Sequence, residues 1–437
     1  MQGNVKIGVI CCCKYSFDYE AATEIYEGIR EKLVAIPGVA WLLWDKMIVT
    51  AEDAQEAGAA MAAGLADGCV IISGTFHLGH IPLIMNSCIR RPILLWALDE
   101  LPYNGGKIRL NSVCAINLNA SNLYKSGIHN FSCNIGNEID MHWIDAMKMI
   151  KAIKCAKMGL VGYSAEGFFN VNVADLDLYK YADILVSHYE LKEFYSKESK
   201  SDKPISAKDL ESVYCCDHLK KTQVEQVAQL AESIKTFMDE KGLDALTVRC
   251  WPEFAEVFGM APCAAMSYLQ GLGYILGCEG DIEGTLSMVA VQKLAGHAPF
   301  MADLSQVNFE DDYALMWHCG VAPYTLWDEV SERSLSDYRD GGKGMTADFV
   351  MKNGQITFMR IDTANGKTRV FAERGDVIPM AKDLRGTYCK VRFEKSIREI
   401  IDLVTETGVA HHVAMVYGDY MDAIRKFAKI MNFEMIE

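Results

Sequence analysis

The sequence predicts an α/β protein with two Rossmann-like parallel-sheet domains, followed by a small antiparallel β-barrel-like domain. Three observations lead to this prediction. The chain has 437 residues, more than one ordinary domain holds. Near-continuous apolar runs alternate with helical patterns along most of the chain, and short alternating runs separated by turn dipeptides follow after about residue 320. We expect domain boundaries at residues 1–156, 157–320 and 321–437.

The first domain is predicted from apolar runs at residues 5–10, 68–73 and 92–98. A helical spacing follows the first run, set by Ile25, Ile29 and Leu33. Buried strands that alternate with helices indicate a parallel sheet covered on both faces.

The second domain repeats this alternation, with apolar runs at residues 157–162, 184–187 and 246–250. One face of a long helix between the last two runs carries Val224, Val227, Leu230, Ile234 and Phe237. Gly242 is typical of the C-terminal cap of that helix. A second parallel sheet is therefore expected.

The C-terminal part changes character. Alternating runs at residues 355–361, 368–372 and 388–393 are separated by Asn-Gly and Gly-Asp dipeptides at 353–354, 365–366 and 375–376. Such dipeptides between alternating runs are typical of antiparallel hairpins. We expect a barrel or sandwich, closed by a final helix over residues 420–430.

The composition narrows the class of partner. The formal net charge is −15, and nucleic acid and anionic membranes both attract basic surfaces, so a small molecule is the expected partner. Fifteen cysteines occur in runs such as Cys11-Cys12-Cys13, which do not suit a disulfide framework. With no signal-peptide pattern at the N-terminus, we expect a cytoplasmic protein with reduced thiols.

Several side chains of metal-ligand type stand at the ends of predicted elements. Glu279, Asp303 and His318 each end an apolar segment, and the pair His411-His412 follows a helical stretch. The carboxyl edge of an open α/β sheet is where ligands bind. Carboxylates with imidazole suit Mn²⁺, with Mg²⁺, Co²⁺ or Zn²⁺ as alternatives. From spacing alone the ordinary explanation is stronger, because a single strand-end carboxylate is more often a turn residue or a helix cap.

The order of these motifs resembles the active-site motifs of L-arabinose and L-fucose isomerases. The matching strings are Gly277-Cys-Glu-Gly-Asp281, Phe300-Met-Ala-Asp303, His318 and Gly408-Val-Ala-His-His412. The resemblance is clearest from about Arg249 to the end of the chain. Where the arabinose enzymes carry Glu, this chain has Asp303, which is closer to the fucose branch.

The resemblance implies a divalent-metal-dependent aldose–ketose isomerase. Glu279, Asp303 and His412 would bind the metal, and Glu279 and Asp303 would also transfer protons. His318 occupies the position of a further ligand in the arabinose enzymes, and His411 would be a substrate or supporting group. In such a reaction the metal binds both substrate oxygens and stabilises an ene-diolate, while a carboxylate on each side moves the proton.

Other residues are candidates for substrate contact. Arg249 and Trp251 follow a predicted strand at the ligand edge, although packing is the ordinary explanation for the tryptophan. In the resembling enzymes a loop equivalent to the one holding Phe76 and His77 enters a neighbouring subunit's pocket. The resemblance therefore implies a homo-oligomer, a hexamer or a trimer-based assembly. Polar loop histidines remain the ordinary explanation for His77.

The substrate is not readable from the residues. The fucose isomerase-like family includes enzymes for neutral deoxy sugars and for the anionic sulfosugar sulfoquinovose, and this chain is short, like the latter group. An anionic sugar needs a cation, for which Lys14 after the first strand is the candidate. Conversion of sulfoquinovose to sulfofructose is thus expected, with L-fucose or L-arabinose isomerisation as the alternative. A non-catalytic sugar-binding protein is the alternative from another class.

Overall fold

The computed structural model describes residues 4–195, 203–337 and 345–437. Contacts divide the chain into two compact units. The first comprises Met1–Lys151 and Arg425–Phe433, and the second comprises Ala152–Ile424 and Glu434–Glu437. The second unit thus holds both the second parallel sheet and the barrel.

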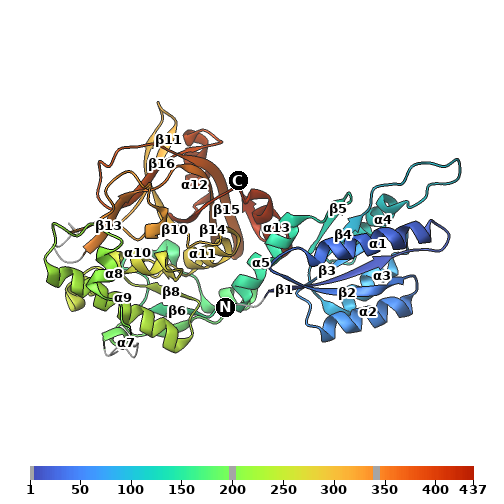
Figure 1. The fold of residues 1–437 in the computed structure, drawn as a ribbon, viewed down its shortest axis with the longest axis horizontal. Coiled ribbons are helices and arrows are strands. Elements are labelled where there is room, and N and C mark those ends of the chain that lie inside the picture. The colour runs from blue at the N-terminus through green and yellow to red at the C-terminus, as the bar shows by residue number, and fades with distance from the viewer. Residues whose placement is uncertain (1–3, 196–202, 338–344) are drawn as a thin grey trace. The chain divides into compact units, whose positions relative to one another are not determined.

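The first unit is built on a five-stranded parallel sheet of order β2-β1-β3-β4-β5. Its strands are β1 (Val5–Cys12), β2 (Val39–Ile48), β3 (Gly68–Ser73), β4 (Ile93–Ala97) and β5 (Phe131–Ile135). The helices are α1 (Tyr19–Val34), α2 (Ala51–Ala63), α3 (His80–Ile89), α4 (Ser112–Lys125) and α5 (Met141–Cys155). All of β3 and β4 is buried, because helices cover both faces of a parallel sheet (Figure 1).

The second unit begins with a four-stranded parallel sheet of order β7-β6-β8-β9. The strands are β6 (Met158–Val161), β7 (Ser187–Tyr189), β8 (Ala245–Val248) and β9 (Ile275–Gly277). The accompanying helices are α6 (Asp175–Ala182), α7 (Lys192–Tyr195), α8 (Ala207–Glu211), α9 (Lys221–Lys241), α10 (Cys263–Gly271) and α11 (Ile282–Ala295), with short turns η1 (Phe169–Val171) and η2 (Phe254–Phe258). Gly242 caps α9 in the left-handed conformation, as predicted.

A six-stranded antiparallel barrel completes the second unit. Its strands pair in the order β16-β11-β10-β17-β14-β15, and β15 pairs with β16 to close it. These strands are β10 (Phe300–Asn308), β11 (Tyr313–His318), β14 (Gly354–Ala364), β15 (Lys367–Ile378), β16 (Thr387–Phe393) and β17 (His412–Tyr417). Further elements are η3 (Tyr324–Leu326), β12 (Ser334–Asp337), β13 (Met345–Val350), α12 (Ile397–Thr407), α13 (Met421–Met431) and β18 (Glu434–Ile436). The predicted fold class is confirmed.

The barrel differs from the expectation in two details. The boundary expected at residue 320 placed residues 300–318 in the second Rossmann-like domain, whereas β10 and β11 pair with strands of the barrel. The turn predicted at Asn365-Gly366 joins β14 to β15, whereas the turn predicted at Gly375-Asp376 is wrong. Gly375 lies inside β15 and pairs with both neighbouring strands, and a side chain there would meet the Arg392 carbonyl at 2.6 Å. This glycine permits a close backbone approach and not a turn.

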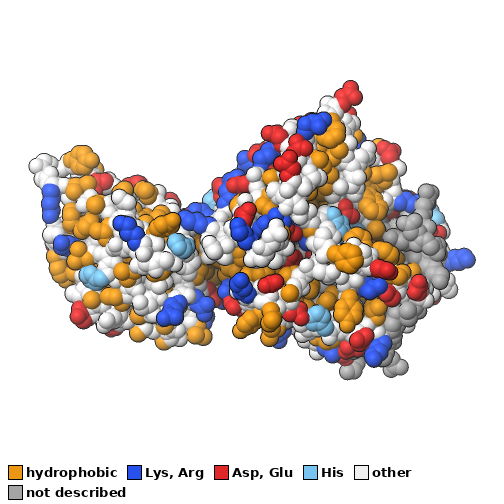
Figure 2. Space-filling view, turned by 180° about the vertical axis from the view of Figure 1, so that it is seen from behind, with side chains coloured by type: hydrophobic (Ala, Val, Ile, Leu, Met, Phe, Trp, Pro, Cys, Tyr) orange, Lys and Arg blue, Asp and Glu red, His pale blue; other side chains and the backbone are white. Residues whose placement is uncertain are grey.

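The surface is mixed in character. Figure 2 shows acidic, basic and hydrophobic side chains interspersed over the face drawn. Among the described residues, no helix combines the length and the apolar content needed to cross a bilayer.

Candidate metal centre

Glu279 directly follows the short strand β9, at the carboxyl edge of the second parallel sheet. The Gly280 N–H donates to the Val248 carbonyl and the Ala165 N–H donates to the Glu279 carbonyl, both at 3.0 Å. Glu279 has φ +60°, in the left-handed region that a side chain disfavours by roughly 1–3 kcal/mol. Residues held in this conformation by their surroundings are concentrated at functional sites, and these hydrogen bonds fix where the carboxylate lies.

Asp303 and His412 come from neighbouring antiparallel strands of the barrel. Asp303 in β10 is the direct register partner of His412, the first residue of β17. Directly opposite residues on antiparallel strands share one face of the sheet. The register therefore brings together two side chains that are more than a hundred residues apart in sequence, with Asp303 Oδ1 3.6 Å from His412 Nε2.

His318 ends strand β11, and its ring is buried. The ring stacks on that of His412, with centroids 5.6 Å apart and an interplanar angle of 23°. The Cys319 N–H donates to His318 Nδ1 at 2.8 Å. In a neutral imidazole whose Nδ1 accepts a hydrogen bond, the proton lies on Nε2, so this contact favours Nε2 as a donor over Nε2 as a metal ligand.

These side chains form two overlapping groups. Glu279, His411 and His412 make one, and Asp303, His318 and His412 make the other; within each group the ligand atoms lie within 4.8 Å of one another. Glu279 Oε2 lies 3.4 Å from the Nε2 atoms of both His411 and His412. The structure therefore assembles the five residues that sequence reasoning singled out, from the sheet edge and from three barrel strands or their ends.

Unsatisfied atoms in the cluster test whether a cation would fit. Asp303 Oδ1, His318 Nε2 and His412 Nε2 are buried and make no hydrogen bond among the described residues. Leaving a buried polar atom unsatisfied costs about 1–3 kcal/mol. A divalent cation would satisfy Asp303 Oδ1 and His412 Nε2, and together with Glu279 this donor set fits Mn²⁺, Mg²⁺ or Co²⁺.

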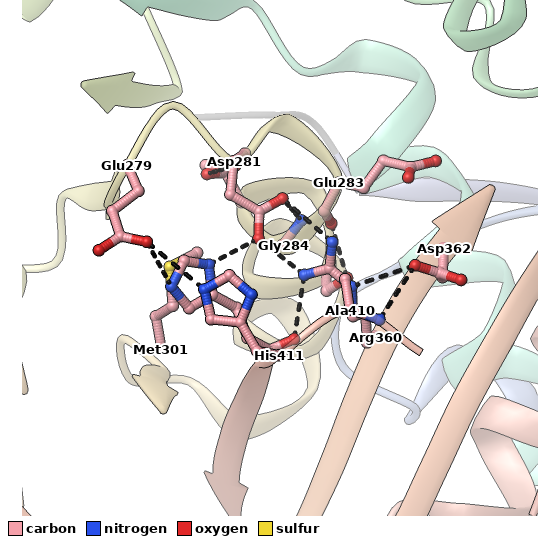
Figure 3. A network of polar contacts seen from close by, with 12 residues as sticks. Glu279, Asp281, Glu283, Gly284, Met301, Arg360, Asp362, Ala410 and His411 are labelled. Carbon is pink, nitrogen blue, oxygen red and sulfur yellow. Dashed lines mark hydrogen bonds and ion pairs between the residues drawn. The ribbon is translucent and has the colours of Figure 1, made fainter. Parts of the chain in front are cut away.

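A buried ion network fixes His412 from behind (Figure 3). His412 Nδ1 lies 2.9 Å from Asp281 Oδ2, and Asp281 forms a fully buried ion pair with Arg360 at 2.7 Å. Arg360 also donates to the His412 carbonyl at 3.0 Å. Metal-binding histidines commonly donate their other ring N–H to a carboxylate, which fixes the tautomer. Asp281 thereby directs His412 Nε2 toward Glu279 and Asp303.

Sequence reasoning missed this network. Asp281 belonged to a quoted motif, but no role was assigned to it. The available signal was Arg360, an arginine between the apolar residues Met359 and Ile361 of β14, whose side chain is completely buried. A buried charge requires a partner of opposite sign, although the sequence does not say which carboxylate it is.

The electrostatics of the cluster favour positive charge. Burial lowers the pKa of His412, but the neighbouring carboxylates of Asp281 and Glu279 outweigh it and raise the pKa to about 10. Burial raises the pKa of Glu279, yet the neighbouring imidazoles of His411 and His412 lower it well below the usual range. The negative charge that stabilises a proton on His412 would equally stabilise a metal cation in its place.

His411 lies beside Glu279 and is held by a loop that the sequence did not indicate. Phe168 stacks on its ring, with centroids 5.3 Å apart, and Asn170 Nδ2 lies 3.1 Å from its Nδ1. Trp251 packs edge-on against Phe168 at 6.0 Å. Trp251 is 42% exposed, so it is available to a ligand beside the cluster.

Arg249 follows β8 at the same edge of the sheet, as predicted. It pairs with Glu253, with Nη2 2.7 Å from the carboxylate. Its charge is thus already balanced, and a role in binding an anionic substrate receives no support from this geometry.

The remaining predicted substrate residues lie in the first unit. Lys14 is half-buried, and among the described residues no carboxylate forms an ion pair with it. Phe76 packs against Phe17 at 5.8 Å. His77 is buried, with Nε2 3.1 Å from Ser73 Oγ and 3.2 Å from Asn119 Nδ2, and burial lowers its pKa to about 4. The His77 ring is therefore a neutral part of the core, and its geometry does not support substrate contact.

Comparison with known proteins agrees with this geometry. Residues 334–437 match the family of the L-fucose isomerase C-terminal domain. A sulfoquinovose isomerase of Priestia aryabhattai is 26% identical over 402 residues, which cover 89% of this chain and 90% of the relative. Sulfoquinovose isomerases of Alkalicoccus urumqiensis and of a Clostridium species are 25% and 24% identical, covering 79% and 78% of this chain and 80% of each relative.

The two parallel sheets, the barrel and these relatives together define an enzyme of the aldose–ketose isomerase class. The sugar-binding protein without catalysis, considered as an alternative, is not supported. The resemblance to fucose isomerase-like enzymes that was inferred from the four motifs is confirmed.

Proposed function

We propose that this enzyme is a divalent-metal-dependent aldose–ketose isomerase that moves a proton between neighbouring sugar carbons through an ene-diolate. The observation that carries the proposal is the convergence of Glu279, Asp303 and His412, with buried ligand atoms that no hydrogen bond satisfies. Mn²⁺ is the expected ion, with Mg²⁺ or Co²⁺ as alternatives.

Each residue of the cluster has a distinct role in this proposal. Glu279, Asp303 and His412 would hold the metal, and the metal would supply Lewis-acid stabilisation of negative charge on adjacent substrate oxygens. His318 would donate a hydrogen bond from Nε2 to the substrate, because its Nδ1 already accepts one from the Cys319 N–H.

The two carboxylates transfer the proton. Asp303 Oδ1 accepts no hydrogen bond from the described residues, and Glu279 Oε2 has only long contacts of 3.4 Å to the histidines, so both retain lone pairs for a substrate proton. Placed on two sides of the cluster, one carboxylate can remove a proton from one carbon and the other can assist its return to the next. Phe168 and Trp251 offer an apolar wall to a sugar ring at the same edge.

Metal removal tests the proposal. Dialysis against a chelator is expected to abolish turnover, and added Mn²⁺ is expected to restore it, because the ligand set loses its cation. Elemental analysis should show at least about one divalent ion per chain in active samples. Full turnover in a sample shown to be metal-free would refute the proposal.

We propose sulfoquinovose as the substrate, because the relatives reported above carry that activity in their names. Isomerisation of L-fucose or L-arabinose is the alternative. The sulfonate of sulfoquinovose is anionic and needs a cationic partner. Lys14 forms no ion pair among the described residues, so we propose it as this partner.

The Lys14→Ala variant tests this assignment. It is expected to raise KM for sulfoquinovose at least about tenfold, as loss of a charge-assisted hydrogen bond predicts, without a comparable change for L-fucose. The matched control is Lys46→Ala, which removes an exposed lysine paired with Glu56 in the same unit. More efficient turnover of neutral sugars by the wild-type enzyme, or an equal effect of Lys14→Ala on all substrates, would overturn the assignment.

We also propose a homo-oligomer, a hexamer or a trimer-based assembly. Tyr163, Phe169 and Trp251 are 68%, 82% and 42% exposed near the cluster, and exposed aromatic groups of this kind mark interaction surfaces. Light scattering is expected to report a multiple of the 48.7 kDa chain mass. An active monomer would rule out this proposal.

The cytoplasmic location expected from the sequence remains a prediction.

A further inference from the structure

A second group of metal-ligand side chains lies in the same unit, outside the cluster described above. It consists of Cys215 and His218, from the connection between α8 and α9, and Glu332, which shortly precedes β12. Their ligand atoms all lie within 4.8 Å of one another, and His218 Nε2 is 3.8 Å from Glu332 Oε2. The three residues are half-buried or exposed, so an ion can reach them from solvent.

The backbone beneath this group is fixed on both sides. The Cys215 N–H donates to the Arg333 carbonyl at 2.8 Å, and the Leu335 N–H donates to the Cys215 carbonyl at 3.0 Å, so Cys215 is paired with the segment that carries Glu332. Lys382 Nζ donates to the Glu332 carbonyl at 2.8 Å. The separation of Cys215 from Glu332 is therefore set by hydrogen bonds and does not depend on flexible chain ends.

Arg333 adds to this rigidity. Its guanidinium donates to the Val213 carbonyl at 2.6 Å and to the Tyr324 carbonyl at 3.2 Å, and it lies 4.5 Å from the centre of the Trp327 ring. The ligands on either side thus project from anchored backbone, as a preorganised metal site requires.

We propose that Cys215, His218 and Glu332 bind a Zn²⁺ ion, with solvent in the fourth position. Thiolate, imidazole and carboxylate are all ligands of tetrahedral zinc, and three protein ligands leave one position open. On binding, the thiol S–H bond is replaced by a sulfur–zinc bond and the proton goes to solvent, without any oxidation or reduction. The thiolate distinguishes this site from the Glu279, Asp303 and His412 cluster, whose ligands are oxygen and nitrogen.

A metal here would join two segments that are far apart in sequence. Residues 215–218 belong to the connection between two helices of the parallel-sheet part, whereas Glu332 leads into the strands β12 and β13 beside the barrel. Closing so long a loop stabilises the folded chain, because the ion binds the native arrangement and not the unfolded chain. The expected role is structural, as a link between the parallel-sheet part and the C-terminal strands.

Cobalt substitution of the full-length enzyme tests the proposal. Co²⁺ bound to a thiolate is expected to give a near-ultraviolet charge-transfer band, which oxygen and nitrogen ligands do not produce. The band should be present in the wild type and lost in Cys215→Ser, and Zn²⁺ added after Co²⁺ should displace it. The rise in Tm on adding Zn²⁺ is also expected to be larger in the wild type than in Cys215→Ser or His218→Ala, by roughly 2 °C or more.

Cys216→Ser is the matched control. Cys216 is the adjacent cysteine and is also half-buried, but its sulfur contacts the Tyr214 carbonyl and is not part of the group. It should retain both the band and the Zn²⁺-dependent rise in Tm. Absence of the band in the wild type, its persistence in Cys215→Ser, or its equal loss in Cys216→Ser would each overturn the proposal. None of these variants alters the candidate metal centre, so the results do not depend on its assignment.

Discussion

Replacing Glu279 by Gln is expected to lower kcat by a factor of about 10³ or more while leaving the fold intact. The substitution preserves the shape of the side chain but removes both a metal ligand and a proton acceptor, and general acid–base catalysis alone contributes about 10²–10⁴-fold. Asp303→Asn should have the same effect for the same reason. Steady-state kinetics with sulfoquinovose, with circular dichroism and metal analysis of each variant, make the measurement.

Glu310→Gln is the control for this substitution, because Glu310 is exposed in the turn between β10 and β11 and lies outside the cluster. It should retain near wild-type kinetics. If Glu279→Gln or Asp303→Asn kept a rate within about tenfold of the wild type, neither carboxylate could be doing the chemistry assigned to it.

Replacing Arg360 by Met should destabilise the protein by about 3–5 kcal/mol, the usual cost of removing one partner of a buried ion pair. Arg360 and Asp281 are both completely buried, so the substitution leaves the Asp281 carboxylate without its compensating charge. The free energy of unfolding in urea measures the loss. Metal affinity should fall as well, because Asp281 orients His412.

Arg374→Met provides the matched comparison in the neighbouring strand of the barrel. Arg374 pairs with Glu394 and with Asp419, both at 2.6 Å, but its side chain is 36% exposed. Water screens these pairs, so the expected loss is much smaller than that of Arg360→Met. Equal losses in the two variants would show that the buried network does not have the structural role inferred for it.

Together, these two experiments distinguish residues that act in catalysis from residues that stabilise the fold and orient His412. In the proposed mechanism Glu279 and Asp303 act on the substrate, whereas Asp281 and Arg360 contact His412 and act through it. Loss of rate without loss of stability is expected for the carboxylates. For Arg360→Met, the main expected effect is a loss of stability.

The secondary structure was predictable wherever a local pattern determined it. The apolar run at residues 68–73 predicted β3, and Asn365-Gly366 predicted the turn between β14 and β15. Periodicity and turn chemistry depend on residues that are close in sequence, so both can be recognised in a single sequence. Gly375-Asp376 shows the limit, because the same dipeptide lies inside a strand when the barrel brings another backbone against it.

The candidate site was likewise predictable only in part. From its sequence alone, this protein could be predicted to present Glu279, Asp303, His318, His411 and His412 at the ends of apolar segments, in an order that resembles sugar isomerases. Only the tertiary structure decided that Asp303 pairs in register with His412, and that Asp281 and Arg360 lie behind them. The physical reason is that strand register and the partner of a buried charge are set by barrel closure, which joins residues distant in sequence and leaves no periodic signal along the chain.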